Sequence, residues 1–325
     1  MFLWLALLVF MMVPSWSTEQ MPQCANKTII ITGANSGLGY EATKAFATKG
    51  ATVIMACRSI ERGQQAATDI RNNVDMASGD LTVRQCDLAS LESIKSFAAA
   101  VSREYDSIDI LSNNAGVMAI PRQETEDGFE KQFGVNHLGH FALTGHLLEL
   151  MISGDDESRV VTHSSGAHEF GKINFDDLQR KQSYGKWEAY GQSKLANLLF
   201  AYELQRRFET AEITQTISVA CHPGYAATNL QYRGPKQSGS ALRLRMMKVA
   251  NRIFGQSAAD GVLPLLYAST ATDVQGSEYY GPNGFLNMRG APEEQSSSQE
   301  SYDTQTAQRL WRRSETLTGV SFEFS

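Results

Sequence analysis

The sequence has few cysteines, no excess of positive charge and no internal repeat, and these shortages exclude several classes of protein. Its four cysteines (Cys24, Cys57, Cys86 and Cys221) are scattered and form no CxxC pair, which argues against a disulfide framework or a zinc site and fits a reducing compartment. The formal net charge of −6 gives no support for nucleic-acid binding, so we expect no such partner. With 325 residues, 42% of them hydrophobic, the chain can build one large core.

The sequence also lacks a hydrophobic run long enough to span a membrane, which takes about twenty residues. Its longest run, residues 1–13, has no basic residues before it and no clear small-residue cleavage site after it. Three interpretations stay open: an anchor or signal anchor, a cleaved signal, or a leader absent from a mature protein that starts at Met21. We therefore expect a protein of the cytoplasm, or one that associates with a membrane through residues 1–16 and faces the cytoplasm.

Short β-branched runs alternate with helical stretches along the rest of the chain. Strands are expected at 27–32, 51–56, 81–86, 108–111, 159–163, 214–221 and 278–281. This alternation predicts an α/β fold with a single doubly wound, Rossmann-type parallel sheet of about seven strands and helices on both faces. Right-handed crossovers bring the loops that follow the strands to one edge of the sheet.

We predict three regions. Residues 1–20 form the apolar leader, 21–290 the Rossmann-type domain, and 291–325 a polar linker and a C-terminal helix. A basic and apolar segment at 241–254 falls inside a proposed substrate lid at about 225–260, although a membrane-surface helix would show the same pattern. The terminal helix, about 302–317, is expected to dock through Leu310, Trp311 and Leu317.

A glycine-rich turn, GANSGLG at 33–39, follows the first expected strand and precedes a helix. Strand, glycine loop and helix together present backbone N–H groups to a phosphate. The spacing GxxxGxG differs from the common GxGxxG, and a turn that only packs closely is the alternative. The candidate phosphate-binding residues are Gly33, Asn35, Ser36, Gly37, Leu38 and Gly39.

The second expected strand ends in Cys57-Arg58, without the carboxylate that would bind the ribose hydroxyl of NAD. A guanidinium at this place can pair with a 2′-phosphate, which favours NADP(H) over NAD(H), whereas a solvated surface arginine is the alternative. Small residues after the fourth strand, Asn113 to Gly116, leave room for an adenosine group.

Tyr190 and Lys194 lie four residues apart on an expected long helix, so they face the same space. An ammonium near a phenol favours the phenolate and lowers its pKa, which suits acid–base catalysis. Ser164 and Ser165 end the fifth strand, where they either cap a turn or bind a substrate carbonyl. His137, His140 and His146 have no carboxylate partners at ligand spacing, so we expect no metal.

Taken in order, these motifs resemble the short-chain dehydrogenase/reductase family over roughly residues 26–284. Four longer strings are similar to its branch of retinol dehydrogenases and WW-domain oxidoreductases: MACRS (55–59), VNHLGHF (135–141), GKINFDDL (171–178) and YGQSKLAN (190–197). Residues 171–182, inserted between Ser165 and Tyr190, are expected to form part of the substrate rim, as in that branch.

The resemblance implies four catalytic residues. Tyr190 would exchange a proton with the substrate oxygen, and Lys194 would lower its pKa and hold the nicotinamide ribose. Ser165, rather than Ser164, would orient the substrate carbonyl, and Asn136 would support a proton relay through Lys194 and water. The further cofactor residues implied are Asp87, Leu88, Asn114, Ala115, Gly116, Pro223 and Gly224.

The sequence therefore predicts an NADP(H)-dependent oxidoreductase that interconverts a hydrophobic alcohol and its aldehyde or ketone, with a retinoid, a steroid or another lipid-like carbonyl as substrate. Two alternatives stay open: a regulatory protein that binds the cofactor without turnover, and a reductase of a tetrapyrrole double bond. Self-association into a homo-oligomer fits the same resemblance.

Overall fold

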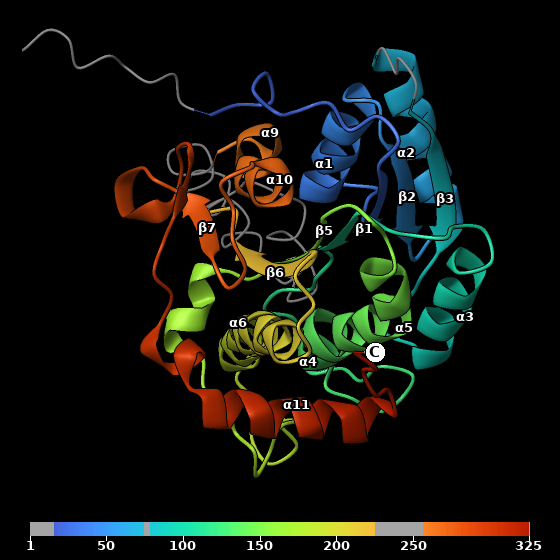
Figure 1. Ribbon diagram of the computed structural model, residues 1–325. Helices are drawn as coiled ribbons and strands as arrows, with labels where there is room; N and C mark the ends of the chain where they lie inside the picture. Colours follow the sequence, from blue (N-terminus) through green and yellow to red (C-terminus); the bar gives the residue numbers. More distant parts are fainter. Residues whose placement is uncertain (1–15, 75–78, 225–255, 325) are drawn as a thin grey trace, which may run out of the picture.

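The computed structural model describes residues 16–74, 79–224 and 256–324. Its sheet has the strand order β3-β2-β1-β4-β5-β6-β7-β8, and the pairs from β3 to β7 are parallel (Figure 1). The strands are β1 (Thr28–Thr32), β2 (Thr52–Cys57), β3 (Leu81–Gln85), β4 (Ile110–Asn113), β5 (Ser158–His163), β6 (Thr216–Cys221), β7 (Tyr279–Pro282) and β8 (Pro292–Glu294). The predicted Rossmann-type sheet is confirmed.

Strand β8 is an addition to the seven strands that the sequence predicts. It pairs antiparallel with β7, so that Pro282 faces Pro292 at the far edge of the sheet. We expected a polar linker here because the segment is short, has no apolar alternation and begins with proline. An edge strand tolerates proline, since one side of its backbone needs no partner.

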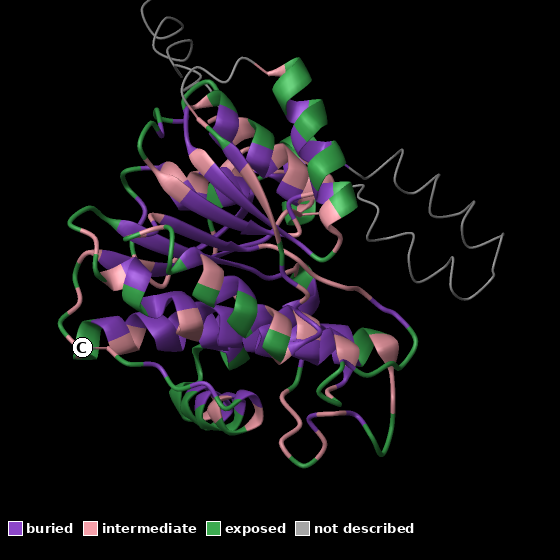
Figure 2. Ribbon diagram, turned by 90° about the vertical axis from the view of Figure 1, so that its right-hand side faces the viewer, coloured by how far each residue is buried: buried purple, intermediate pink, exposed green. Residues whose placement is uncertain are grey.

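Helices cover both faces of the sheet, as Figure 1 shows. They are α1 (Gly37–Thr48), α2 (Ile60–Asn73), α3 (Leu91–Val101), α4 (Lys131–Phe133), α5 (Gly139–Ile152), α6 (Lys186–Thr210), α9 (Ala258–Gly261), α10 (Leu263–Thr270) and α11 (Thr304–Thr318). Ile29 and Ile31 of β1 face the core under α1 and α2, whereas Ile30 faces the core under α3, α5 and α6. Both faces are therefore buried (Figure 2), which explains the continuous apolar runs of the strands.

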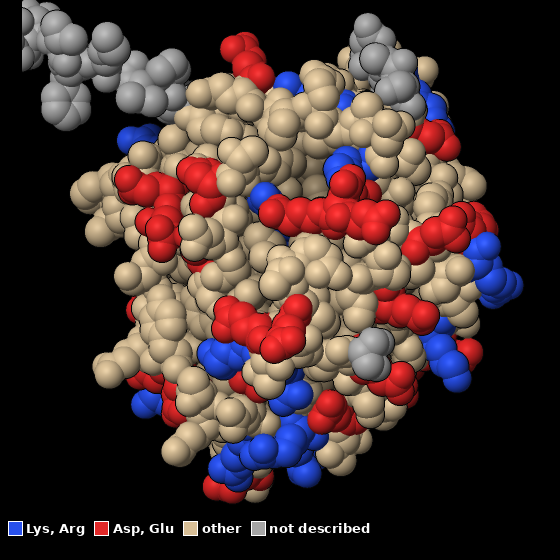
Figure 3. All heavy atoms as spheres, viewed as in Figure 1, with Lys and Arg blue, Asp and Glu red and all other residues tan. Residues whose placement is uncertain are grey.

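The C-terminal helix α11 docks on α6, as predicted. Leu310 and Trp311 are buried, and the Trp311 ring stacks on Phe200 with centroids 5.7 Å apart. Leu317 is partly buried against the same layer. Exposed arginines of α11, Arg312 and Arg313 among them, face outward, and basic side chains gather at the lower edge of the view in Figure 3.

The segment 171–182, which we expected at the rim of the substrate site, packs in part against the core. Leu178 is buried in an apolar cluster with Phe133 of α4, Leu195 of α6 and Leu310 of α11. Through Leu178 the segment therefore packs against helices α4, α6 and α11.

The first described residues of the chain, Trp16 among them, also take part in the fold. The Trp16 ring packs edge-on against Tyr267 at 5.2 Å, and Met21 is buried in the core under α1. The proposed attachment through residues 1–16 falls almost wholly outside the described residues, as does most of the proposed lid at 225–260. In the described part of the chain, no helix is long and apolar enough to cross a membrane.

Four buried histidines make the fold sensitive to acid. Burial lowers the pKa of His137 and of His163 to about 3, and that of His140 and of His222 to about 4. As the pH falls below about 6.5, the unfolded chain takes up these protons first, so each histidine reduces the free energy of unfolding by about 1.4 kcal/mol per pH unit. We expect the melting temperature to fall steeply between pH 6.5 and 4. Thermal unfolding followed by circular dichroism checks this, and a constant melting temperature from pH 7 to 5 would contradict it.

Candidate active site

A cleft opens at the carboxyl edge of β1, β2 and β4, where the sequence predicts cofactor contacts. It is lined by Gly33, Asn35, Ser36, Gly37, Leu38, Gly39, Ala56, Arg58, Arg62, Cys86, Asp87, Leu88, Asn114, Ala115, Gly116, Val117, Lys131 and Val135. The structure therefore brings the glycine turn, Arg58, the Asp87-Leu88 pair and the Asn114–Gly116 segment together around one space. Pro223 and Gly224, which we grouped with them, follow β6 and do not line this cleft.

Two glycines of the turn are required by its geometry. Gly37, the first residue of α1, has φ +58°, a left-handed conformation that glycine adopts without strain. A Cβ on Gly39 would lie 2.4 Å from the carbonyl oxygen of Gly33, so no larger residue fits. No side chain therefore covers the backbone of the turn at Gly37 and Gly39, next to the N-terminus of α1. This arrangement fits a phosphate.

The hydroxyl of Thr32, which sequence reasoning did not single out, fixes the opposite wall of the cleft. It accepts hydrogen bonds from the backbone N–H groups of Asn114 and Ala115, both at 2.9 Å. It lies 2.9 Å from Nε2 of His140, whose Nδ1–H donates to the carbonyl of Asn136. Burial lowers the pKa of His140 to about 4, so the ring is neutral at pH 7. The place of Thr32 at the end of β1 is a signal that could have suggested this role.

Two guanidinium groups stand at the cleft, whereas the sequence suggested one. Arg58 is exposed directly after β2, and Arg62 lies one turn into α2. The Ser59 hydroxyl caps α2 by accepting from the Arg62 N–H, which fixes the turn that carries both cations. The spacing of four residues between the arginines could have revealed the second.

Tyr190 and Lys194 lie on α6, beside the end of β5. Both are buried, and the Lys194 ammonium is 5.9 Å from the centroid of the Tyr190 ring. The ammonium donates a hydrogen bond of 3.0 Å to the carbonyl of His163. A Cβ on Gly116 would lie 3.9 Å from this ammonium, so the floor of the cleft reaches Lys194.

The two serines after β5 face different surroundings. The Ser164 hydroxyl is buried and donates to the backbone carbonyl of Lys194 at 2.9 Å. Ser165 is half-buried at the start of a short 3₁₀ turn, where its hydroxyl accepts from the Ala167 N–H at 3.3 Å, and it is near enough to the Tyr190 phenol to oppose the rise in the pKa of that phenol. Of the two, Ser165 is therefore the one placed beside Tyr190.

The pKa of Tyr190 does not shift in the direction that we predicted. Burial raises it to about 12, and the neighbouring Ser165 hydroxyl opposes that rise. Burial also lowers the pKa of Lys194 to about 8. The expected lowering of the Tyr190 pKa by Lys194 is absent. Burial removes water from the phenolate, which raises the pKa, and the Lys194 ammonium bonds to the His163 carbonyl instead of the phenol.

Both polar atoms of the Asn136 side-chain amide hydrogen-bond to other groups of the protein. Its oxygen accepts from the N–H of Val117, and its nitrogen donates to the carbonyl of Val117 and to the Ser193 hydroxyl, at 2.8 to 2.9 Å. Asn136 lies in a π-helical turn, Gly134–Leu138, between α4 and α5. Both amide hydrogens are therefore used, and neither reaches Lys194.

Comparison with known proteins agrees with this geometry. The family described as short chain dehydrogenase matches residues 27–238. Mouse retinol dehydrogenase 14 is 38% identical over 304 residues, covering 90% of this chain and 86% of its own, and human retinol dehydrogenase 13 is 40% identical over 298 residues, covering 90% and 85%. A solved structure of an uncharacterized Mycobacterium paratuberculosis protein is 39% identical, with a TM-score of 0.77 over 95% of this chain and 99% of that one.

These matches span most of the chain and include both the glycine turn and the Tyr190 helix. Family members bind a nicotinamide cofactor at the carboxyl edge of such a sheet and act on CH–OH groups. The chain belongs to the short-chain dehydrogenase/reductase family, in its retinol dehydrogenase-like branch.

Proposed function

We propose that the protein is an NADP(H)-dependent oxidoreductase that interconverts a hydrophobic alcohol and its aldehyde or ketone. The observation that carries this proposal is the grouping of Tyr190, Ser165 and Lys194 beside the floor of the glycine-lined cleft. A regulatory protein that only binds the cofactor would not need a buried phenol beside a half-buried hydroxyl.

The cleft residues fit a dinucleotide with a 2′-phosphate. The bare backbone of Gly33 to Gly39 and the N-terminus of α1 would hold the pyrophosphate, and Arg58 and Arg62 would hold the 2′-phosphate. Asp87, Leu88 and the segment 114–116 would surround the adenosine. When bound, the nicotinamide supplies or accepts the hydride.

The protein's own part is to orient the substrate and move a proton. Ser165 donates a hydrogen bond to the substrate oxygen, and Tyr190 exchanges its phenolic proton with the same oxygen. With a pKa raised to about 12, Tyr190 carries its proton at neutral pH. A protonated phenol is the form that donates to a carbonyl oxygen, so Tyr190 can supply the proton that reduction of an aldehyde or ketone requires.

An aromatic side chain next to Tyr190 supports an apolar substrate. Trp187, in the first turn of α6, is 50% exposed although its ring packs edge-on to Tyr190 at 6.1 Å. A large exposed aromatic surface beside the reacting group suits a flat hydrophobic molecule. Relatives named retinol dehydrogenases point to the same substrate class. A screen of retinoids, steroids and simple aldehydes that follows NADPH absorbance tests this proposal, and cofactor binding without turnover across the screen would favour the regulatory alternative.

Charge reversal at Arg58 tests the choice of cofactor. We expect Arg58→Glu to weaken NADP binding by about tenfold to a hundredfold, because the change removes a charge-assisted bond and adds repulsion of the 2′-phosphate. Binding of NAD, which lacks that phosphate, should change by less than about twofold. Arg103→Glu is the control, since Arg103 is exposed in the turn after α3 and does not line the cleft. Titration by fluorescence gives the Kd values, and an equal loss for both cofactors would refute the assignment.

A further inference from the structure

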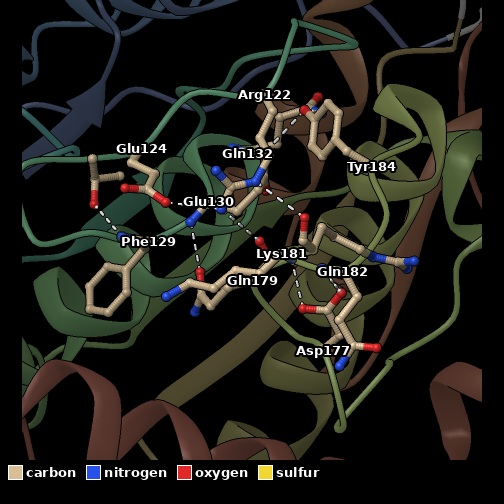
Figure 4. Close-up of polar contacts among 12 residues, drawn as sticks. Arg122, Glu124, Phe129, Glu130, Gln132, Asp177, Gln179, Lys181, Gln182 and Tyr184 are labelled. Carbon is tan, nitrogen blue, oxygen red and sulfur yellow. Dashed lines mark hydrogen bonds and ion pairs between the residues drawn. The ribbon is translucent and has the colours of Figure 1, made fainter.

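Gln132 is a buried residue outside the motifs of the sequence, and it connects two walls of the active site. Its amide oxygen accepts from the backbone N–H of Ala119 at 2.7 Å. Its amide nitrogen donates to the carbonyl of Lys186 and to the hydroxyl of Tyr184, both at 2.9 Å. Figure 4 shows Gln132 among Glu130, Tyr184 and Arg122. Its side chain is 0% exposed, and each polar atom of the amide has a protein partner.

The two ends of this connection belong to functional segments. Ala119 continues the chain from Gly116 and Val117 of the cleft, and it has φ +48°, which is strained for a residue with a Cβ. Lys186 is the first residue of α6, one turn before Tyr190, and no side chain caps this end of the helix. Gln132 therefore ties a strained segment of the cleft to the uncapped first turn of the catalytic helix.

Asn136, one helical turn after Gln132, repeats the same pattern. Its amide oxygen accepts from the backbone of Val117, and its amide nitrogen donates to the Ser193 hydroxyl on α6. The two amides thus attach one segment, residues 117–119, to α6 at residues 186 and 193. Tyr190 lies between these two points of attachment.

We propose that Gln132 is a positioning residue for Tyr190, acting with Asn136 as a two-point attachment of the catalytic helix to the cleft wall. This inference rests on the proposed function, because it assigns a role at the same site. With one point removed, the first turn of α6 can shift, and the phenol loses its alignment with Ser165. A displacement of about 1 Å at a reacting group costs on the order of a hundredfold in rate.

The test compares Gln132→Met with Tyr184→Phe. The first variant removes both attachments at nearly constant side-chain volume. The second removes a buried hydroxyl from the same cluster but leaves the bonds from Gln132 to Ala119 and Lys186 intact. We expect Gln132→Met to lower kcat by about tenfold or more, with the Kd of NADPH changed by less than about twofold, and Tyr184→Phe to keep kcat within about twofold. Wild-type kcat in Gln132→Met, or equal losses in the two variants, would overturn the proposal.

Hydrogen–deuterium exchange gives a readout that needs no turnover. Peptides from residues 186–193 should exchange faster in Gln132→Met than in the wild type or in Tyr184→Phe. If the 186–193 peptides exchange faster in Gln132→Met but the wild type shows no turnover, the attachment is supported and the proposed function is refuted. If exchange in Gln132→Met is unchanged while the wild type is active, only the attachment is refuted.

If Gln132→Met does not fold, Gln132→Glu takes its place. It keeps the acceptor for the Ala119 N–H and, when ionised, loses the donor to Lys186. Exchange at 186–193 should again rise and kcat should fall, by about fivefold or more. Wild-type exchange and kcat in Gln132→Glu would overturn the proposal.

Discussion

Replacement of Tyr190 by phenylalanine is expected to lower kcat by about a hundredfold to ten-thousandfold, the range that a positioned acid or base contributes. The Tyr190 phenol is a buried acid beside Ser165, and removal of its hydroxyl leaves the substrate oxygen without a proton donor. The Kd of NADPH should stay within about twofold, because the ring remains and none of the cleft-lining residues changes. Steady-state kinetics and a cofactor titration measure the two quantities.

Tyr202→Phe is the matched control for this experiment. Tyr202 lies on the same helix, is equally buried, and hydrogen-bonds to Ser297 at 2.8 Å, far from Ser165 along the chain. Its replacement should cost stability without a loss of kcat. Full activity in Tyr190→Phe, or the same loss in both variants, would exclude Tyr190 as the acid.

The second large effect on activity is expected from substitution of the serines that follow β5. Ser165→Ala should lower kcat/KM by about a hundredfold, since it removes a hydrogen bond to the oxygen on which charge changes during the reaction. Ser164→Ala removes a hydroxyl that donates to the carbonyl of Lys194, so we expect it to lower the melting temperature with a far smaller effect on kcat/KM. Comparison of kcat/KM and melting temperature in the two variants distinguishes a serine that contacts the substrate from one that stabilises the fold. The reverse order of effects would assign Ser164 as the substrate contact.

The features predicted well from sequence are those that local rules determine. The strands of the parallel sheet are continuous apolar runs because both faces are buried, and their order along the chain fixes which loops meet. The glycine turn, Arg58 and the Asn114–Gly116 segment could thus be placed around one cleft before any geometry was known. Tyr190 and Lys194 needed only helical spacing to be placed together.

The features that sequence reasoning missed depend on tertiary contacts. Gln132 lies in a motif-free stretch and becomes notable only because Ala119 and Lys186 approach it from distant parts of the chain. The π-helical turn around Asn136 has no sequence signal of its own. The pKa of Tyr190 rises instead of falling because burial, which spacing does not reveal, outweighs a nearby charge.

The most direct test of the proposed function follows a hydride from cofactor to product. NADPH deuterated at C4 of the nicotinamide, with the label on each face in turn, is mixed with the protein and an apolar aldehyde from the screen. We predict that the alcohol product carries a single deuterium on its carbinol carbon for one of the two labelled cofactors, and that Tyr190→Phe forms almost none of it. Tight binding of NADPH with no labelled alcohol from any aldehyde would contradict the proposed function and leave a protein that binds its cofactor without using it.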